Sequence, residues 1–410
     1  MIAEPIQPDT LAGRRIVLGV CGSIAAYKVV QLARDLTLAG ALVDVIMTEA
    51  AARFVGPATF QALTGRPVLT SMWDLPEDGV VGHVTLGAMA DAVVIAPATA
   101  NTIARIAAGL SDDLLTTTLL ATRAPVLLAP AMNPLMYSHP ATQANLATLR
   151  ARGYTVLEPG DGRMAEHVSG KGRLPEPATL EAEVRAMLGR THGPLRDVRV
   201  VITAGGTREP IDPVRYVGNR SSGQMGYALA ARARDLGASV TLISGPTALM
   251  PPPAVHVHAV ETALQMQAAV NEAVASADLL IMNAAVADFR PDQMATSKLK
   301  KTPGTTGMTL HMVTNPDILA DLPPQPRLFK VGFAAETDDL LANAQAKLER
   351  KGLHLIVAND AVTSIGQPQI TLTLLDQHGA TILERQPKSE AAAALLEAIT
   401  LRFQAWRASQ

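Results

Sequence analysis

A glycine turn near the start of the chain carries residues suited to binding an anion. Gly22 and Ser23 follow the apolar run Arg15–Val20 and precede an alanine-rich stretch in which apolar residues recur at helical spacing. Backbone amides at such a strand-to-helix turn, together with the positive end of the helix, attract a phosphate group. The full G-x-G-x-x-G spacing is missing, so close packing of helix on strand explains this turn, taken alone, equally well.

Hydrogen-bonding side chains follow two further apolar runs. Thr48 comes directly after the run 42–47, and Thr99 and Asn101 follow the run 92–96. Open parallel sheets bind ligands at the carboxyl ends of their strands, which makes these three residues candidates for one ligand site. Thr99 also stands where a helix N-cap is expected, and capping is the more frequent single role.

A second turn rich in small and polar residues occupies 204–226, directly after the apolar run 200–203. Arg208, Arg215 and Arg220 give this stretch affinity for anions. Its serine and glycine pairs are explained as well by helix capping and by close helix packing. An NAD(P) reductase of the short-chain type is disfavoured, because no tyrosine is followed four residues later by lysine.

Three lysines in the C-terminal half are suited to stabilising a polyphosphate. Lys347 and Lys351 lie four residues apart on an expected helix, where a polyphosphate would relieve their mutual repulsion. Their place before Gly352, at the negative end of that helix, is an equally good explanation. Lys298 lies in a basic stretch without periodicity, which by itself indicates solvated surface or a flexible loop.

The elements that hold these residues are expected to form two α/β domains. A length of 410 residues and a hydrophobic content of 48% are sufficient for two separate cores. Apolar runs separated by helix-length segments predict a parallel, doubly wound sheet in each half. A proline-containing stretch places the boundary between domains 1–190 and 191–410. We expect 370–375 and 381–384 to pair as an antiparallel edge hairpin, and 388–406 to form the closing helix.

Composition excludes several classes of partner and site. The formal charge of −2, from 35 basic and 37 acidic residues, gives no basic surface for nucleic acid or for an anionic membrane. No apolar run approaches the roughly 18 residues that a membrane-spanning helix needs. The single cysteine, Cys21, excludes intramolecular disulfides and thiolate zinc sites and fits a reducing compartment. We therefore expect a soluble, cytoplasmic protein that acts on small molecules.

Segments spread over nearly the whole first domain resemble the flavin-dependent cysteine decarboxylases. The matching stretches are 24–28, 82–84, 111–115 and 130–134, in that order. The resemblance implies a flavodoxin-like Rossmann domain, assembled as trimers with FMN at a subunit interface. The positions that would bind FMN are Ser23, Thr48, Thr99 and Asn101, beside Gly22 of the phosphate turn.

Two further residues gain a role from this resemblance. His83 would be the active-site base, and Asn133 would bind the carboxylate of the substrate. Considered singly, they are better interpreted as a surface histidine and a turn asparagine. Flavin chemistry suits such a reaction, because oxidation of the substrate's cysteine moiety to a thioaldehyde creates an acceptor for the electrons released with CO2.

The first domain departs from the family pattern in its flap, at 164–173. The family usually carries a cysteine there as proton donor for the enethiolate that decarboxylation leaves. Glu166 occupies that position in this chain, and Cys21 lies in the phosphate turn instead. Our hypothesis is that Glu166, or the adjacent His167, supplies the proton. The alternative is a decarboxylase that stops at the enethiol.

Most of the second domain resembles phosphopantothenate:cysteine ligase. The matching stretches are 204–226, 283–288, 298–301, 315–318, 332–337 and 358–360. The resemblance implies a second Rossmann-like domain, a nucleotide-binding ligase. It implies CTP binding by Asn283, Ala284, Asp288, Lys298, Pro316, Asp317, Ile318, Leu319, Phe333, Lys347 and Lys351. Lys298 and Asn219 would be the catalytic pair.

The chemistry of such a ligase accounts for these side-chain types. A carboxylate reacts with an amine at neutral pH only after it gains a better leaving group, which attack on the α-phosphorus of CTP provides. The developing charge needs Mg²⁺ and fixed ammonium groups, of which Lys298 is the first candidate, while the ligands of the metal stay unassigned. Asn219 would orient the acyl-cytidylate for attack by cysteine.

The two resemblances together imply one bifunctional enzyme of coenzyme A biosynthesis. It would join cysteine to 4'-phosphopantothenate and then decarboxylate the product to 4'-phosphopantetheine, in a homo-oligomer, with decarboxylase trimers linked by ligase dimers into a dodecamer. Two other functions stay open. One is a regulatory flavoprotein subunit without decarboxylation, which Glu166 permits. The other is a peptide-cysteine decarboxylase of the lantibiotic type, which would share only the flavin half.

Overall fold

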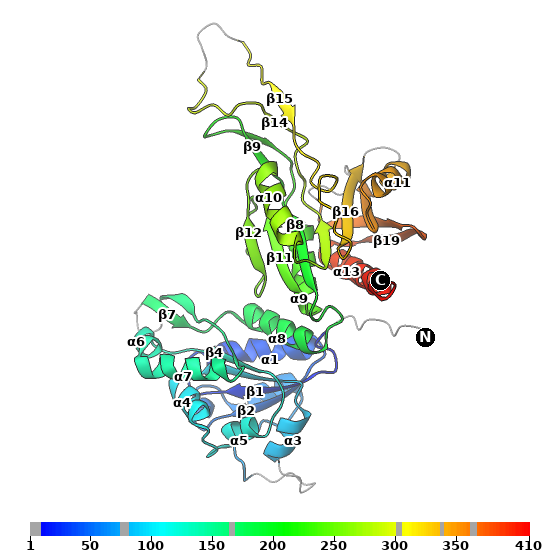
Figure 1. The fold of residues 1–410 in the computed structure, drawn as a ribbon. Helices are drawn as coiled ribbons and strands as arrows, with labels where there is room; N and C mark the ends of the chain where they lie inside the picture. Colours follow the sequence, from blue (N-terminus) through cyan, green and yellow to red (C-terminus); the bar gives the residue numbers. More distant parts are fainter. Residues whose placement is uncertain (1–9, 74–81, 164–168, 301–305, 337–339, 361–366) are drawn as a thin grey trace. The chain divides into compact units, whose positions relative to one another are not determined.

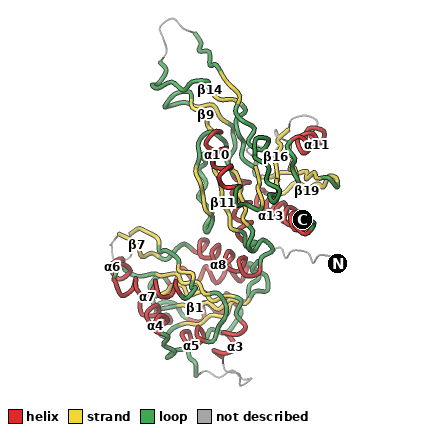
Figure 2. The backbone as a smooth tube through the Cα atoms, in the orientation of Figure 1, coloured by secondary structure: helices red, strands yellow, loops and turns green. Residues whose placement is uncertain are grey.

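The structure of the chain is a computed structural model that describes residues 10–73, 82–163, 169–300, 306–336, 340–360 and 367–410. Contacts within the chain divide it into two compact units, Met1–Leu188 and Gly189–Gln410. Each unit is an α/β fold built on its own sheet, which is parallel in the first unit and mostly parallel in the second (Figures 1 and 2). The expected fold class is therefore confirmed. No helix among the described residues is long and apolar enough to cross a bilayer.

The first unit is a five-stranded sheet in the order β2-β1-β3-β4-β5, with every pair parallel. The strands are β1 (Arg15–Val20), β2 (Leu42–Met47), β3 (Ala92–Ala98), β4 (Val126–Pro130) and β5 (Thr155–Val156). Side chains along β1 alternate between two cores, as they do in a sheet buried on both faces. Because the strands are parallel, the four long ones, β1 to β4, have their carboxyl ends at the same edge of the sheet.

Helices cover both faces of this sheet. One core contains residues of α1 and α8, and the other contains residues of α4, α5 and α7. The helices are α1 (Ala26–Leu38), α2 (Pro57–Thr64), α3 (Gly82–Met89), α4 (Ala100–Ala108), α5 (Leu114–Leu120), α6 (Pro134–Ser138), α7 (Pro140–Ala151) and α8 (Pro177–His192), with a 3-10 turn at Ala51–Arg53. A separate hairpin consists of β6 (Gly160–Arg163) and β7 (Ser169–Arg173).

The second unit is an eight-stranded sheet in the order β12-β11-β8-β13-β16-β17-β18-β19. The strands are β8 (Arg199–Ala204), β11 (Ser239–Ser244), β12 (His256–Ala259), β13 (Leu279–Met282), β16 (Phe329–Glu336), β17 (Leu355–Asp360), β18 (Gln369–Asp376) and β19 (Gly379–Pro387). Pairing is parallel from β12 to β17 and antiparallel at β18 and β19. The predicted antiparallel edge hairpin is confirmed.

The helices in the described part of the second unit are α9 (Gln224–Asp235), α10 (Ala263–Val274), α11 (Leu340–Arg350) and α13 (Lys388–Ala408). The predicted closing helix is confirmed, and its buried face carries Leu395, Ile399 and Phe403. Phe403 and Trp406 of α13 pack against Phe329 of β16, and Trp406 also packs against His354, the residue before β17. The rings of Phe329 and His354 are stacked 4.7 Å apart. The last helix is thus fixed by an aromatic cluster.

Two short ribbons extend beyond the carboxyl ends of the central strands of this unit. β9 (Arg208–Pro210) pairs with β10 (Tyr216–Gly218), and β14 (Phe289–Pro291) pairs with β15 (Met312–Thr314) (Figure 1). Strands of three residues show no period in the sequence, so these four strands were not predicted. Both ribbons matter, because Asn219 directly follows β10 and Lys298 lies in the segment between β14 and β15.

Candidate functional site

A cleft of about 1380 Å³ opens at the carboxyl edge of the sheet in the first unit. It is bounded by the segments that follow β1, β2, β3 and β4, as expected for an open parallel sheet. Of the residues predicted to bind FMN or substrate, those that line it are Gly22, Ser23, Thr48, Thr99, Asn101 and Asn133. The fold therefore brings together residues that are more than 100 positions apart in the sequence.

The glycine turn at the start of α1 leaves room for an anion. Ser23 accepts a hydrogen bond from the Ala25 amide through its hydroxyl, at 3.3 Å, and no side chain caps the helix. A side chain at Gly22 would lie 2.4 Å from the Cβ atom of Ala50, so only glycine fits there. The uncapped end of the 13-residue helix gives the turn the amides and the dipole that a phosphate needs.

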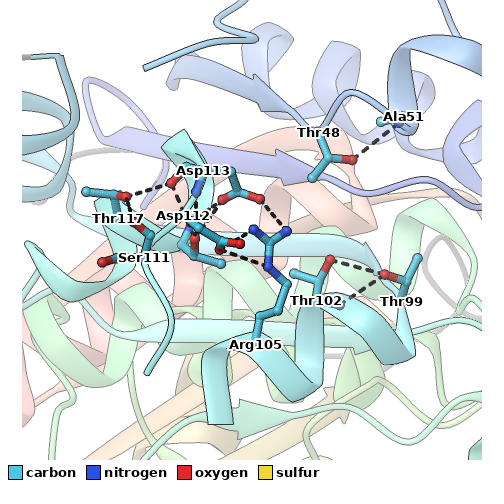
Figure 3. A network of polar contacts seen from close by, with 10 residues as sticks. Thr48, Ala51, Thr99, Thr102, Arg105, Ser111, Asp112, Asp113 and Thr117 are labelled. Carbon is cyan, nitrogen blue, oxygen red and sulfur yellow. Dashed lines mark hydrogen bonds and ion pairs between the residues drawn. The ribbon is translucent and has the colours of Figure 1, made fainter. Parts of the chain in front are cut away.

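Threonines after β2 and β3 combine structural bonds with exposure to the cleft. Thr48 accepts a hydrogen bond from the Ala51 amide at 3.2 Å (Figure 3). Thr99 is the N-cap of α4 and accepts from the Thr102 amide at 3.3 Å, so the capping interpretation is confirmed. Both also line the cleft, and Asn101 beside them is exposed.

An ion-pair network that the sequence analysis did not predict forms the wall between α4 and α5. Arg105 of α4 donates to Asp112 and, at 2.8 Å, to Asp113 (Figure 3). Asp113 also caps α5 by accepting from the Thr116 amide at 2.8 Å. The hydrogen bond from Arg105 lowers the pKa of Asp112. One guanidinium therefore fixes the start of α5 beside the cleft.

The segment with Asn133 is held against the β6–β7 hairpin. The side chain of Asn133 caps α6 by accepting from the Leu135 amide at 2.9 Å. The Met132 amide donates to the Gly172 carbonyl oxygen at 3.1 Å, and a side chain at Gly170 would meet Pro134 at 3.0 Å. Asn133 is thus positioned at the cleft by the described part of the hairpin. Glu166 and His167 lie outside the described residues.

His83 and Cys21 lie outside the lining of the cleft. His83 is half-buried at the start of α3. Cys21 is fully buried in the core beneath the sheet, and this burial raises the pKa of its thiol to about 11. The thiol is therefore protonated at neutral pH.

In the second unit, Asn219, Asn283 and Ala284 meet at the ends of β8 and β13. The side-chain amide of Asn219 donates to the Ala285 carbonyl oxygen at 3.1 Å. The backbone amide of Ala284 donates to the Thr203 hydroxyl at 3.0 Å. A side chain at Gly226 of α9 would meet Ala204 at 2.5 Å, and the Asn283 amide oxygen at 3.0 Å. Small residues thus allow α9 to approach both strands closely.

Lys351 lies beside the segment 316–319. Its ammonium group is 2.9 Å from the Asp317 carboxylate. Ile318 and Leu319 are buried in the core of the unit, so only their backbone can face a ligand. The other predicted residues there are half-buried or exposed, namely Pro316, Phe333 and Lys347, together with Asp288 and Lys298 on the ribbon segment.

Comparisons with known proteins identify the family. Residues 195–402 match the family described as DNA/pantothenate metabolism flavoprotein C-terminal domain, and residues 5–189 match the family described as Flavoprotein. The chain is 49% identical to the coenzyme A biosynthesis bifunctional protein CoaBC of Vibrio vulnificus over 354 residues, which cover 86% of this chain and 88% of that protein. The chain belongs to the CoaBC family.

Two further CoaBC proteins are similar to this chain, one over almost its full length and one over its C-terminal domain. The Vibrio cholerae CoaBC protein is 46% identical over 397 residues, 95% of this chain and 99% of the relative. A crystal structure of the C-terminal domain of a CoaBC protein is 37% identical, with a TM-score of 0.45, and covers 52% of this chain and 99% of its own. As a CoaBC protein, the chain is a bifunctional enzyme of coenzyme A biosynthesis.

The predictions of family, enzyme class and flavoprotein fold are therefore confirmed. The positioning contacts around the CoaBC sites were not predicted, namely the Arg105 network and the ribbons of the second unit. The stretch 111–115 was recognised only as a matching motif, without a role for its carboxylates. An arginine that precedes two adjacent aspartates across the Gly109 turn is the signal that could have revealed the network.

Proposed function

We propose that the first unit binds FMN in the cleft and decarboxylates 4'-phosphopantothenoylcysteine, which the second unit makes from 4'-phosphopantothenate, cysteine and CTP. The observation that carries the proposal is the gathering of all six predicted cleft residues at one edge of one sheet. The rival function, a regulatory flavoprotein subunit that does not catalyse decarboxylation, would need the flavin site but would have no use for a CTP site.

The residues of the cleft fit a flavin phosphate and a flat ring. The turn at Gly22 and Ser23 presents the positive end of α1 to the phosphate, and apolar side chains such as Met47, Leu115 and Met132 line the remainder. When bound, FMN supplies a hydride acceptor and donor for the cysteine moiety of the substrate. The cleft volume exceeds that of most single-ligand pockets, which leaves space for substrate beside the cofactor.

Asn133 and His83 would have separate roles in decarboxylation, one in binding the substrate and the other as the base. The Asn133 side chain, fixed by its cap of α6, would bind the carboxylate that leaves as CO2. His83 would act as base from a neighbouring copy of the chain. Exposed apolar side chains at the cleft support such a neighbour, since Ile24, Tyr27 and Trp73 are 61%, 61% and 81% exposed. A trimer, linked further through the second units, is the assembly that we propose.

Mixing two inactive variants tests this shared site. His83→Asn and Asn133→Asp should each abolish decarboxylation, and the two are then dissociated, mixed in equal amounts and reassembled. If each site combines residues from two copies, about a quarter of the sites regain both residues, and activity recovers to about that fraction of wild type. No recovery, with reassembly verified by size, would contradict a site shared between copies.

Glu166 is the proton donor in our proposal, with His167 as the alternative. Mass spectrometry of the products distinguishes three outcomes: Glu166 as the donor, His167 as the donor, or no proton transfer by either residue. Glu166→Gln that accumulates the unsaturated enethiol supports Glu166, and the same result for His167→Gln supports His167. Wild type that releases only the enethiol would refute both assignments.

The second unit would activate the phosphopantothenate carboxylate with CTP. Lys298 would stabilise the negative charge that develops on the α-phosphate, and Asn219 would orient the acyl-cytidylate. Lys347 and Lys351 would bind the polyphosphate, and the ion pair between Lys351 and Asp317 supports a position of Lys351 beside the segment 316–319. Among the described residues, no cluster of His, Cys, Asp or Glu could hold a metal ion by itself. We therefore propose that Mg²⁺ enters on the CTP phosphates, its usual mode in nucleotide sites.

A coupled assay with CTP, cysteine, Mg²⁺ and 4'-phosphopantothenate follows pyrophosphate and CO2 together. Pyrophosphate release that depends on both CTP and phosphopantothenate supports the ligase, and Lys298→Gln should remove it while added phosphopantothenoylcysteine is still decarboxylated. A regulatory subunit would release no pyrophosphate. We also propose a cytoplasmic location, which the single, buried Cys21 supports.

A further inference from the structure

Asp212 is a fully buried carboxylate in the loop between β9 and β10. Its side chain has no exposed surface, and it accepts hydrogen bonds from the Val214 and Arg215 amides at 2.8 and 3.0 Å. The Arg215 guanidinium donates to the second carboxylate oxygen through Nε and Nη2, at 3.1 and 2.5 Å. These bonds fold the loop back on itself and hold the pKa of Asp212 below its ordinary range.

The same carboxylate reaches a segment 87 positions further along the chain. Oδ2 of Asp212 accepts from the Leu299 amide at 3.1 Å, and Nη2 of Arg215 donates to the Leu299 carbonyl oxygen at 2.7 Å. A further bond ties the segment to the loop, because the Ala295 amide donates to the Ile211 carbonyl oxygen at 3.0 Å. Both polar groups of the Leu299 backbone are therefore held by one ion pair.

We propose that Asp212 is a positioning residue of the ligase, which fixes Lys298 through the backbone of its neighbour Leu299. The inference rests on the role proposed above for Lys298. Lys298 is exposed and lies outside regular secondary structure, and the Asp212–Arg215 pair holds both backbone polar groups of the next residue, Leu299. A carboxylate is required, because both of its oxygens accept hydrogen bonds. In asparagine, the amide nitrogen would face the donors of Arg215 and Leu299 in one orientation and the amides of Val214 and Arg215 in the other.

The test compares Asp212→Asn with a matched control in the same unit. Asp376 is also a buried carboxylate, paired with Arg402 at 2.6 Å, and it lies on the edge hairpin. Asp212→Asn should lower the rate of CTP-dependent pyrophosphate release on the order of 100-fold, the loss expected when a catalytic group is misplaced by about 1 Å. Asp376→Asn should leave that rate unchanged, and neither variant should alter decarboxylation of added phosphopantothenoylcysteine.

Hydrogen exchange and a double mutant separate positioning from general destabilisation. Exchange at the Leu299 amide should accelerate in Asp212→Asn and not in Asp376→Asn. In a Lys298→Gln background, Asp212→Asn should cause no further loss of ligase activity, because the two residues act through one group. Equal exchange in both variants, or an unchanged ligase rate in Asp212→Asn, overturns the inference. Full ligase activity in Lys298→Gln alone overturns instead the role of Lys298, so the two failures are distinguishable.

Discussion

Replacing Gly22 by alanine adds one methyl group at the closest contact in the proposed phosphate turn. The new Cβ atom would lie 2.4 Å from the Cβ atom of Ala50 and 3.0 Å from its carbonyl carbon. Ala50 precedes the 3-10 turn at Ala51–Arg53, which is tied back by the bond from the Ala51 amide to Thr48. Because the clash falls on the Cβ atom and the backbone of Ala50, which have no side-chain torsion to relieve it, the turn must move away from the end of β2.

The size of the effect follows from the overlap. Overpacking by a methyl group at a rigid contact costs about 1–3 kcal/mol. A phosphate held by the amides of this turn can be bound only with the turn in place, so the same energy weakens FMN binding roughly 5- to 150-fold. Gly56→Ala is the matched control, since its methyl group meets nothing within 4 Å and its φ of −68° suits alanine.

Titration of the apoproteins with FMN, followed by flavin fluorescence, measures the two dissociation constants. Urea unfolding of the apoproteins measures how much of the overlap energy appears as a lower free energy of unfolding and not as weaker FMN binding. The reasoning predicts that the two losses for Gly22→Ala add up to about 1–3 kcal/mol. A Gly22→Ala protein with the affinity and the stability of Gly56→Ala would refute it.

Three further predictions concern single residues. Cys21 should resist a thiol reagent at mildly alkaline pH until the protein unfolds, since burial raises its pKa to about 11; labelling of the native protein at the rate of a free thiol would contradict this. Asp113→Ala should lower the free energy of unfolding by about 1–2 kcal/mol, because α5 loses its cap, and chemical denaturation measures that loss. Burial, with Lys330 nearby, lowers the pKa of His354, whose Nδ1 accepts from the Lys330 amide at 3.0 Å. The unfolded chain therefore binds the extra proton, stability falls as pH drops below about 6.5, and His354→Asn should show a shallower fall in urea unfolding.

Local patterns in the sequence determined the main elements. The apolar runs fixed the strands, because a strand buried on both faces must be apolar along its length. The placing of Gly22, Thr48 and Thr99 directly after such runs was enough to predict that they share one edge. The closing helix was predictable for a similar reason, since a buried stripe at helical spacing admits few other structures.

Tertiary structure alone decided which residues are held by distant partners. The ribbons β9–β10 and β14–β15 have three-residue strands, too short for a period to show. Asp212 and Leu299 are brought together by those ribbons, so no local pattern connects them. The separation of His83 from the cleft likewise depends on how α3 packs. Sequence determined the residue types at strand ends through local periodicity, whereas packing between distant segments determined which of them touch.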